Sequence, residues 1–183
     1  MALYAIADTH LSFGTDKPMD SFPGWSDYTA RLAANWRHLV EPQDTVVIAG
    51  DISWAMKFSE CTADFAFLND LPGQKILLKG NHDYWWNTKR KMDLYLQENH
   101  FDTLKILHNQ AIPYGDVALC GSRGWFFEDT PEAQDEKVLA REVGRIRMSL
   151  EAAGDREKIV FLHYPPCLLY TSPSPREGAT SRM

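Results

Sequence analysis

Five short apolar segments recur along the chain, and a polar or glycine-containing turn closes each of them. Their apolar residues are almost continuous rather than alternating with polar ones, which is typical of strands that are covered on both faces of a sheet. The pattern therefore predicts strands over residues 3–7, 45–49, 75–78, 117–120 and 158–162.

Between these segments, apolar residues recur every three or four positions, which is the spacing of one face of a helix. The three sets are Tyr28, Leu32, Trp36 and Leu39, then Cys61, Phe65 and Leu68, and finally Leu139, Val143, Ile146 and Leu150. The third helix is predicted to have Thr130 as N-cap and Pro131 at its first position, and to end near Gly154. Strands alternating with helices predict an α/β fold with a largely parallel sheet.

Two stretches, residues 12–26 and 122–130, fit neither pattern and follow predicted strands, so both can form the rim of a site. No linker interrupts the preceding pattern, and we expect one domain over residues 1–169. Residues 170–183 change abruptly to Ser, Pro, Thr and Arg, a composition typical of a disordered tail. The same stretch resembles the adaptor-like read-through that ends some truncated environmental gene models, so a non-native tail is the alternative.

The composition is that of a folded domain rather than a disordered segment. Of the 183 residues, 44% are hydrophobic and 24% are charged. Nineteen Lys and Arg residues against twenty-five Asp and Glu residues give a net charge of -6, which disfavours nucleic acid as a partner without excluding it. A small phosphorylated substrate is compatible with this charge if the site supplies its own cations.

Neither a signal peptide nor a membrane span is expected. The N-terminus reaches Asp8 and His10 before any long apolar run, and no later stretch approaches about 18 apolar residues. The sequence therefore predicts a soluble, cytoplasmic protein. Cys61, Cys120 and Cys167 show no C-x-x-C spacing, so we expect reduced and mostly buried thiols rather than a disulfide or a cysteine zinc site.

Polar residues close four of the five predicted strands. Because side chains alternate along a strand, Asp8 and His10 should point to the same side where the first strand ends. Asp51, residues 81–83 and His163 follow three other strands, and in open α/β sheets ligands bind at this carboxyl edge. Carboxylate, imidazole and carboxamide ligands suit manganese, iron or zinc better than calcium. A shared acid such as Asp51 can bridge two divalent ions about 3.5–4 Å apart.

Each of these residues also has a purely structural explanation. Asp8 and Asp51 can be N-caps of following helices, residues 80–83 can form an ordinary turn, and His163 can be a buried core histidine. Their occurrence in one order at one predicted sheet edge favours a metal site over these separate explanations.

The same residues resemble the signature of the calcineurin-like metallophosphoesterases, which runs D-x-H, G-D, G-N-H-D/E and H. The four parts are residues 8–10, 50–51, 80–83 and 163, and the resemblance covers about residues 3–166. The stretches GDISW and NHDYWW further resemble a group of bacterial predicted phosphohydrolases, from which no substrate follows. The resemblance implies a four-layer α/β/β/α sandwich of two sheets flanked by helices.

The resemblance also implies a role for each residue of the motif. The expected metal ligands are Asp8 and His10 for one ion, Asn81 and His163 for the second, and Asp51 as the bridge. His82 would lie beside the ions as an acid or electrostatic stabiliser, with Asp83 orienting its ring. Asn81 can also contact a phosphoryl oxygen of the substrate.

The family pattern continues to a final G-H-x-H that has no counterpart in this sequence, where no histidine follows His163. The resemblance therefore implies that each ion has one protein ligand fewer and that the domain lacks its C-terminal part. An inactive interaction module that kept the fold is the alternative to an enzyme.

Three further features have both a functional and a structural interpretation. Arg123 follows a predicted strand and can bind a phosphate through two hydrogen bonds, or it can be a surface arginine. Residues 89–91 can steer an anion or form a solvated helix face. The aromatic residues that can stack a base, wall a pocket or belong to the core are Trp85, Trp86, Trp125 and Phe126.

Together these observations predict a metal-dependent phosphoric ester hydrolase that uses a metal-bound hydroxide on a phosphomonoester or phosphodiester. A nuclease or a cyclic-nucleotide phosphodiesterase of the same superfamily is the enzymatic alternative, and the acidic composition disfavours it.

Overall fold

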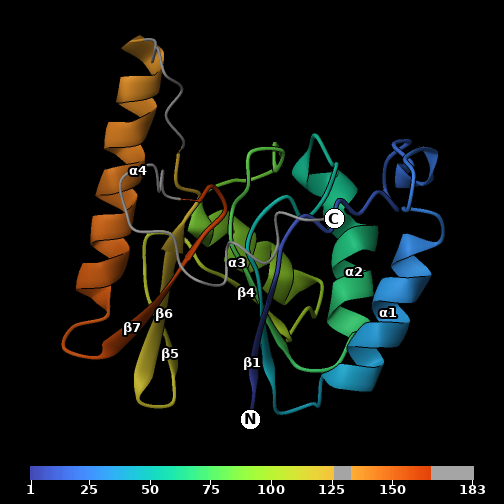
Figure 1. The fold of residues 1–183 in the computed structure, drawn as a ribbon, viewed down its shortest axis with the longest axis horizontal. Helices are drawn as coiled ribbons and strands as arrows, with labels where there is room; N and C mark the ends of the chain where they lie inside the picture. The colour runs from blue at the N-terminus through green and yellow to red at the C-terminus, as the bar shows by residue number, and fades with distance from the viewer. Residues whose placement is uncertain (126–132, 166–183) are drawn as a thin grey trace, which may run out of the picture.

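The computed structural model describes residues 1–125 and 133–165, which form two sheets packed between helices. Figure 1 shows the order of the layers: α1, α2 and α3 on one side, then the two sheets, then α4 on the opposite side. The four-layer α/β/β/α sandwich expected from the resemblance is therefore the observed architecture.

The first sheet contains four parallel strands in the order β1-β2-β3-β4. Their bounds are β1 Leu3–Ile6, β2 Thr45–Ile48, β3 Gln74–Leu77 and β4 Leu104–Ile106. The helices on its outer face are α1 Tyr28–Leu39, α2 Thr62–Asp70 and α3 Lys89–Glu98. Two short 3-10 helices, η1 Met19–Ser21 and η2 Phe58–Cys61, lie in the connections.

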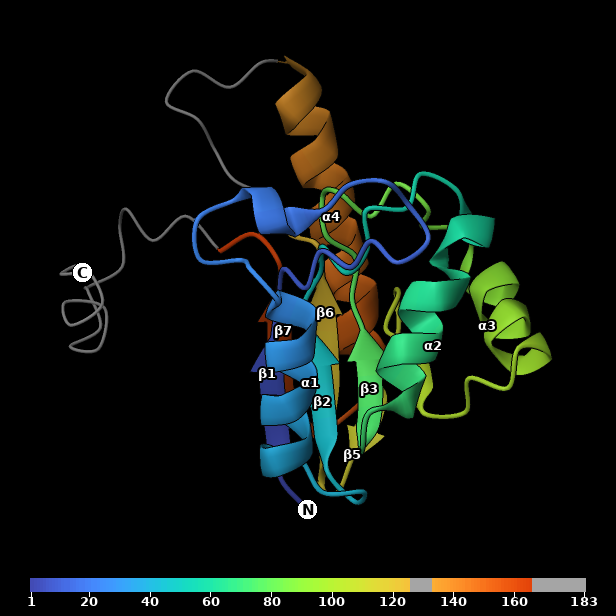
Figure 2. The ribbon, with the colours of Figure 1, turned by 90° about the vertical axis from the view of Figure 1, so that its right-hand side faces the viewer.

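The second sheet contains three strands, in which β6 pairs with β5 antiparallel and with β7 parallel. Their bounds are β5 Ile112–Tyr114, β6 Val117–Ser122 and β7 Glu157–Leu162. Helix α4, Ala133–Ala152, connects β6 to β7 and packs on the outer face of this sheet, behind the first sheet in Figure 2.

The central strands β2 and β6 are buried almost throughout, which explains why they contain mostly apolar residues, whereas β1 and β7 are partly exposed. In β2, Val46 and Ile48 pack toward α1 and α2, whereas Val47 faces the second sheet. In β6, Leu119 belongs to the core between the sheets and Cys120 packs in a smaller cluster near the end of α4. The alternation of side chains along each strand thus connects three apolar layers.

All five predicted strands are present, and α1, α2 and α4 match the predicted helices. Helix α4 ends at Ala152 and Gly154 follows with φ 58°, as the prediction near Gly154 required. The predicted start at Thr130 and Pro131 and the tail over residues 170–183 lie outside the described residues.

Two strands, β4 and β5, were not predicted. Strands β4 and β5 have three residues each, and Pro113 lies in the middle of β5, so neither produces a recognisable apolar run. The pairing is largely parallel, as predicted, but the strands form two sheets, and β5 pairs antiparallel with β6.

Two other expectations concern membrane-spanning segments and thiols. Within residues 1–125 and 133–165, no helix is long and apolar enough to cross a membrane. Cys61 and Cys120 are buried free thiols, as predicted, and Cys167 lies outside the described part of the chain.

Candidate metal centre

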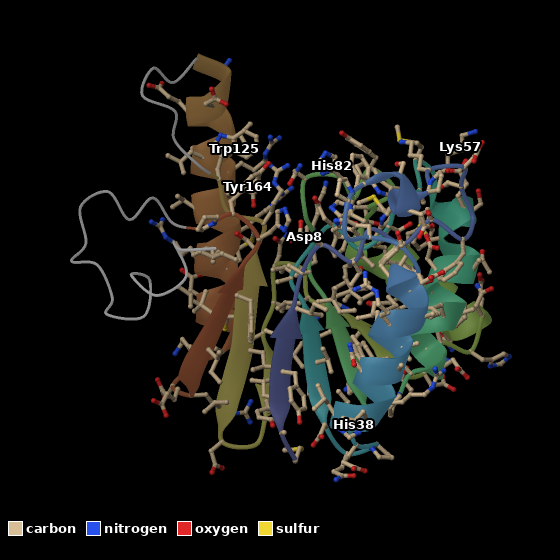
Figure 3. All side chains as sticks on the ribbon, turned by 45° about the vertical axis from the view of Figure 1, so that its right-hand side comes forward. Asp8, His38, Lys57, His82, Trp125 and Tyr164 are labelled. Carbon is tan, nitrogen blue, oxygen red and sulfur yellow. The ribbon has the colours of Figure 1, made fainter. Side chains whose placement is uncertain are left out.

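The predicted site residues come together where the strands of both sheets end. The D-x-H segment follows β1, Asp51 follows β2, Asn81 and His82 follow β3, and His163 follows β7. Figure 3 shows Asp8 and His82 above the carboxyl ends of the strands, with Tyr164 on the side of the second sheet. Residues separated by more than 150 positions thus reach one place because their strands end at one edge of the sandwich.

Backbone hydrogen bonds hold the D-x-H segment beside the segment that carries Asp51. The amide of Asp8 donates to the carbonyl of Gly50 at 3.0 Å, and the amide of His10 donates to the carbonyl of Asp51 at 2.9 Å. The bridge between Leu11 and Ser53 continues this parallel pairing past the ends of β1 and β2. The main-chain positions of Asp8, His10 and Asp51 are therefore fixed relative to one another by these contacts.

Three of the expected ligands have left-handed backbone conformations, with φ values of 57° for Asp8, 42° for His10 and 51° for Asp51. Residues other than glycine rarely adopt this region, and such strain concentrates at functional sites. Gly50 has φ 103°, and a Cβ atom there would lie 2.6 Å from Nδ1 of His163 and 2.7 Å from Cα of Gly80. Only glycine lets the two ligand-bearing turns approach so closely.

The side chains leave a compact set of possible metal-binding atoms. Asp8, Asp51 and His163 each offer one such atom, and all three atoms lie within 4.8 Å of one another. His10 Nε2 lies 3.6 Å from Asp8 Oδ1 and 3.9 Å from Asp51 Oδ2. These separations exceed a hydrogen bond but suit two ligands that each lie about 2.0–2.2 Å from a common ion. The residues therefore fit divalent metal ions.

The tautomer of His163 supports the same conclusion. Its Nδ1 lies 2.9 Å from the backbone carbonyl of Ala49 and can only donate there, which leaves Nε2 of the neutral ring with its lone pair. That lone pair faces Asn81 Oδ1 at 2.7 Å. Two acceptors directed at one another suit a cation that both can bind, and a backbone carbonyl on the other ring nitrogen is the usual support of a metal-binding histidine.

The protonation states at this edge also suit metal binding, which requires ionised carboxylates and neutral imidazoles. Burial lowers the pKa of His10, although the charges of Asp51 and Asp8 act in the opposite direction. Burial alone would raise the pKa of Asp51, but hydrogen bonds from the His82 ring and amide and the nearby His163 outweigh it and hold the pKa below its usual range. At neutral pH Asp51 is therefore ionised and His10 is neutral.

The part of the site around Asp51 is buried, and the part around Asp8 and His82 is open to solvent. The Asp51 side chain is 3% exposed, whereas Asp8 is 54% and His82 is 36% exposed. His82 is held by its amide and by its ring nitrogen Nδ1, which lie 2.8 and 2.7 Å from the two carboxylate oxygens of Asp51. A substrate can therefore reach His82 and Asp8 from solvent while Asp51 stays covered.

Asp83 has a different position from the one expected. Its carboxylate does not orient the His82 ring in the described structure; Asp51 and Asn81 contact that ring instead. One oxygen of Asp83 accepts the amides of Asp51 at 2.9 Å and Gly80 at 2.7 Å. The other accepts the amide of Ile52 at 2.9 Å. Asp83 therefore ties together the two turns that carry Asp51 and Asn81.

Asp83 is fully buried, and burial raises its pKa to about 6 even though the surrounding amide donors act against this shift. A second buried acid, Asp64, extends the network by accepting hydrogen bonds from the Ser53 hydroxyl and the Phe13 amide. The sequence alone did not reveal Asp64, because an acidic residue in the first turn of a helix usually has a local electrostatic explanation.

Aromatic rings position His10, another contribution that was not predicted. The His10 imidazole stacks on Trp54 with ring centroids 4.7 Å apart and an interplanar angle of 18°, and Trp25 contacts it edge-on. The buried Nδ1 atom of His10 has no hydrogen-bond partner among the described residues. Stacking thus replaces the hydrogen bond that usually fixes the ring of a metal-binding histidine. The sequence offered one signal of this contact, because Trp54 lies shortly after Asp51.

The remaining predicted candidates lie in several places. Arg123 is close to the site but pairs with Glu142 and lies over the Trp125 ring, 4.7 Å from its centroid. Trp85 is buried in the apolar cluster between the first sheet and its helices, and Trp86 packs against that cluster. Arg90 and Lys91 are exposed on α3, which favours the solvated helix face. Phe126 lies outside the described residues.

The model of the calcineurin-like phosphoesterase family matches residues 1–176, nearly the whole chain. The chain belongs to this family. A calcineurin-like phosphoesterase is a metal-dependent hydrolase of phosphate esters, which agrees with the ligand-bearing edge described above. No curated protein matches the chain significantly.

Two solved structures resemble this calcineurin-like phosphoesterase. The phosphopantetheinyl hydrolase PptH from Mycobacterium tuberculosis has a TM-score of 0.53 and 16% identity, and the alignment covers 93% of this chain and 72% of PptH. A protein of unknown function, AQ665 from Aquifex aeolicus, has a TM-score of 0.47 and 22% identity over 88% of this chain and 90% of its own. At these identities the similarity to PptH supports the fold alone.

Proposed function

We propose that this chain hydrolyses a phosphate monoester or diester with two divalent ions bound at the carboxyl edge of its strands. Asp8 and His10 would hold one ion, Asn81 and His163 the other, and Asp51 would bridge them. The observation that carries the proposal is the meeting of these side chains, with the acceptor atoms of Asn81 and His163 only 2.7 Å apart. We propose manganese, iron or zinc, because imidazole and carboxylate ligands are mixed.

When bound, the ions would lower the pKa of a water molecule and offset charge on the phosphoryl oxygens. The chain itself supplies positioning and proton transfer. His82, which is open to solvent and paired with Asp51, can donate a hydrogen bond to the substrate or a proton to the leaving oxygen. Asn81 presents its side-chain amide beside the His82 ring and can contact a phosphoryl oxygen. The buried Asp51 and Asp83 keep these groups in place.

The test is hydrolysis of p-nitrophenyl phosphate by the purified chain with added Mn²⁺. We expect Asp51→Asn to reduce kcat/KM by at least about a hundredfold, because metal assistance provides several kcal/mol. Calorimetric titration with Mn²⁺ should show weaker binding by the same variant. Asp70→Asn, which changes an exposed acid paired with Arg37 on the surface, is the matched control and should retain both properties.

Undiminished turnover or unchanged Mn²⁺ affinity in Asp51→Asn would refute the bridging role. Parallel assays with bis(p-nitrophenyl) phosphate separate a diesterase from a monoesterase. If wild type and control bind Mn²⁺ but hydrolyse neither ester, the inactive interaction module becomes the better description of this chain.

A further inference from the structure

A second polar cluster lies beside the metal centre, between the ends of β3 and β6 and the inner face of α4. It surrounds a narrow cavity whose polar lining includes Lys79, His108, Arg123, Glu142 and Arg145. Lys79 follows β3, Arg123 follows β6, and the last two residues are one helical turn apart on α4. Three separate elements thus direct basic side chains toward one cavity.

The positive charges of this cluster exceed its negative charges. Glu142, whose side chain is 2% exposed, lies 2.6 Å from Arg145 and 3.4 Å from Arg123 through the same carboxylate oxygen. One acid thus faces three basic side chains, because Lys79 also lines the cavity. Asp83, the other acid that acts on Lys79, already accepts several backbone amides. Among the described residues, the side chains that line the cavity therefore carry about two more positive than negative charges.

Two neighbouring observations indicate that this excess is not balanced within the described residues. The Arg123 Nε atom is buried and has no hydrogen-bond partner there. Burial lowers the pKa of His108 to about 4, and the positive charges of Arg145, Lys79 and Lys89 act in the same direction. A buried donor and a positive potential in one cavity are properties of an anion site.

The cluster adjoins the proposed catalytic edge. Lys79 lies two residues before Asn81, and the carbonyl of Arg123 accepts the amide of Tyr164, which follows His163, at 2.8 Å. The Tyr164 ring contacts both His163 and Trp125. In Figure 3, Trp125 and Tyr164 lie on the α4 side of the site, facing the region of His82 and Asp8. A molecule at the metal centre can thus extend along this aromatic wall toward the basic cluster.

We propose that the cavity formed by Lys79, Arg123 and Arg145 binds a second anionic group of the substrate. The substrate would then be a phosphate ester whose other part carries a second phosphate or a carboxylate. Guanidinium groups bind the oxygens of both groups through paired hydrogen bonds. The cavity is narrow, so it suits oxygens of an anionic group at its mouth rather than a ring or an alkyl chain. This inference rests on the proposed function.

The experiment compares inhibitors that differ only in the second charge. Alkylphosphonates with two to six carbons are compared with α,ω-bisphosphonates and ω-carboxyalkylphosphonates of the same length as inhibitors of p-nitrophenyl phosphate hydrolysis. At one or more lengths, a second anionic group should improve inhibition at least about tenfold, the worth of a charge-assisted hydrogen bond. The two series distinguish a phosphate subsite from a carboxylate subsite.

Arg145→Gln should abolish this advantage and leave inhibition by the simple alkylphosphonates unchanged. Arg147→Gln makes the same charge change at an exposed position of α4 and should preserve the advantage. An advantage at no chain length, or one that survives Arg145→Gln, overturns the inference even if hydrolysis itself is confirmed.

A second variant, Glu142→Gln, keeps the inference testable if Arg145→Gln fails to fold, because it removes the negative charge and keeps the shape of the side chain. If the cavity binds anions, this variant should bind inorganic phosphate more tightly than wild type in calorimetry of the metal-free chain, and Arg145→Gln more weakly. A cluster that serves only as an internal ion pair predicts equal phosphate binding in all variants, or none. This measurement needs neither metal nor turnover, so it separates failure of the subsite from failure of the proposed function.

Discussion

Replacing Asp83 by asparagine should destabilise the fold strongly. The two carboxylate oxygens accept four backbone amides, from Asp51, Ile52, Ser53 and Gly80, and also the Trp85 indole N–H. An asparagine keeps one acceptor oxygen and turns an NH₂ group toward the donors that the other oxygen served. Each oxygen has at least two donors, so at least two charge-assisted hydrogen bonds are lost in either orientation.

Each such bond contributes about 1.5–3 kcal/mol, so the expected loss is about 3–6 kcal/mol of unfolding free energy. Domains of this kind have a total stability of about 5–15 kcal/mol, so Asp83→Asn should fold only marginally. Urea denaturation at pH 7.5, followed by tryptophan fluorescence, measures the loss as a lower midpoint with an unchanged slope. The exposed Asp70→Asn variant should unfold close to wild type.

A loss below about 1 kcal/mol in Asp83→Asn would refute the argument, because the carboxylate could then not be holding the two turns together. An Asp83→Asn variant that folds and binds Mn²⁺ as tightly as wild type would also contradict the positioning role. If the reasoning holds, Mn²⁺ affinity of the folded variant should fall by about 10–100-fold, which is typical of groups that support metal ligands.

Three further changes test other parts of the structure. Lys75 is fully buried, its Nζ contacts the carbonyls of Leu71 and Gly73, and burial lowers its pKa to about 8. Between pH 8 and about 10.5 the unfolded chain therefore binds more protons than the folded chain, so the unfolding free energy of wild type relative to Lys75→Met should rise through this window by up to about 3 kcal/mol. Urea denaturation at several pH values measures this difference, and a difference that does not change with pH would contradict the prediction. Gly50→Ala should lose several kcal/mol of unfolding free energy and should no longer bind Mn²⁺, because its Cβ would overlap Gly80 and its backbone has positive φ. A variant that unfolds at the same urea concentration as wild type would exclude that overlap. Trp54→Ala should weaken Mn²⁺ binding by about tenfold through loss of the ring that stacks on His10, and unchanged calorimetric affinity would assign Trp54 to packing alone.

The sequence predicted the strands that carry the site because each is a nearly continuous apolar run that is followed by an unusual polar residue. Buried apolar runs such as β2 are continuous, and the residue that follows them, such as Asp51, stands out against them. The same reasoning failed for β4 and β5, whose three residues are too few to define a period. Their pairing partners, not their own composition, determine that they are strands.

The sequence predicted which residues belong to the site better than it predicted the contacts among them. Asp83 was expected beside the His82 ring because the two are adjacent in the sequence, but adjacent side chains in a turn point in different directions. Asp83 instead points inward, to amides more than 25 residues away in the chain, at Asp51 and Ile52. Nothing in the local sequence of Arg145 relates it to Lys79 either, since only the packing of α4 on the second sheet brings them to one cavity. Long-range packing carries this information.

The left-handed conformations of Asp8, His10 and Asp51 mean that the proposed metal ligands lower the stability of the fold. Each costs of the order of 1 kcal/mol that glycine would not incur, and ions that bind only the folded state would offset part of this cost. Laboratory evolution for heat resistance in the presence of a chelator should therefore drift toward glycine at these positions and lose the proposed ligands. Selection with metal supplied should keep them. The backbone angles of three residues thus set a direct competition between thermal robustness and catalysis in this protein.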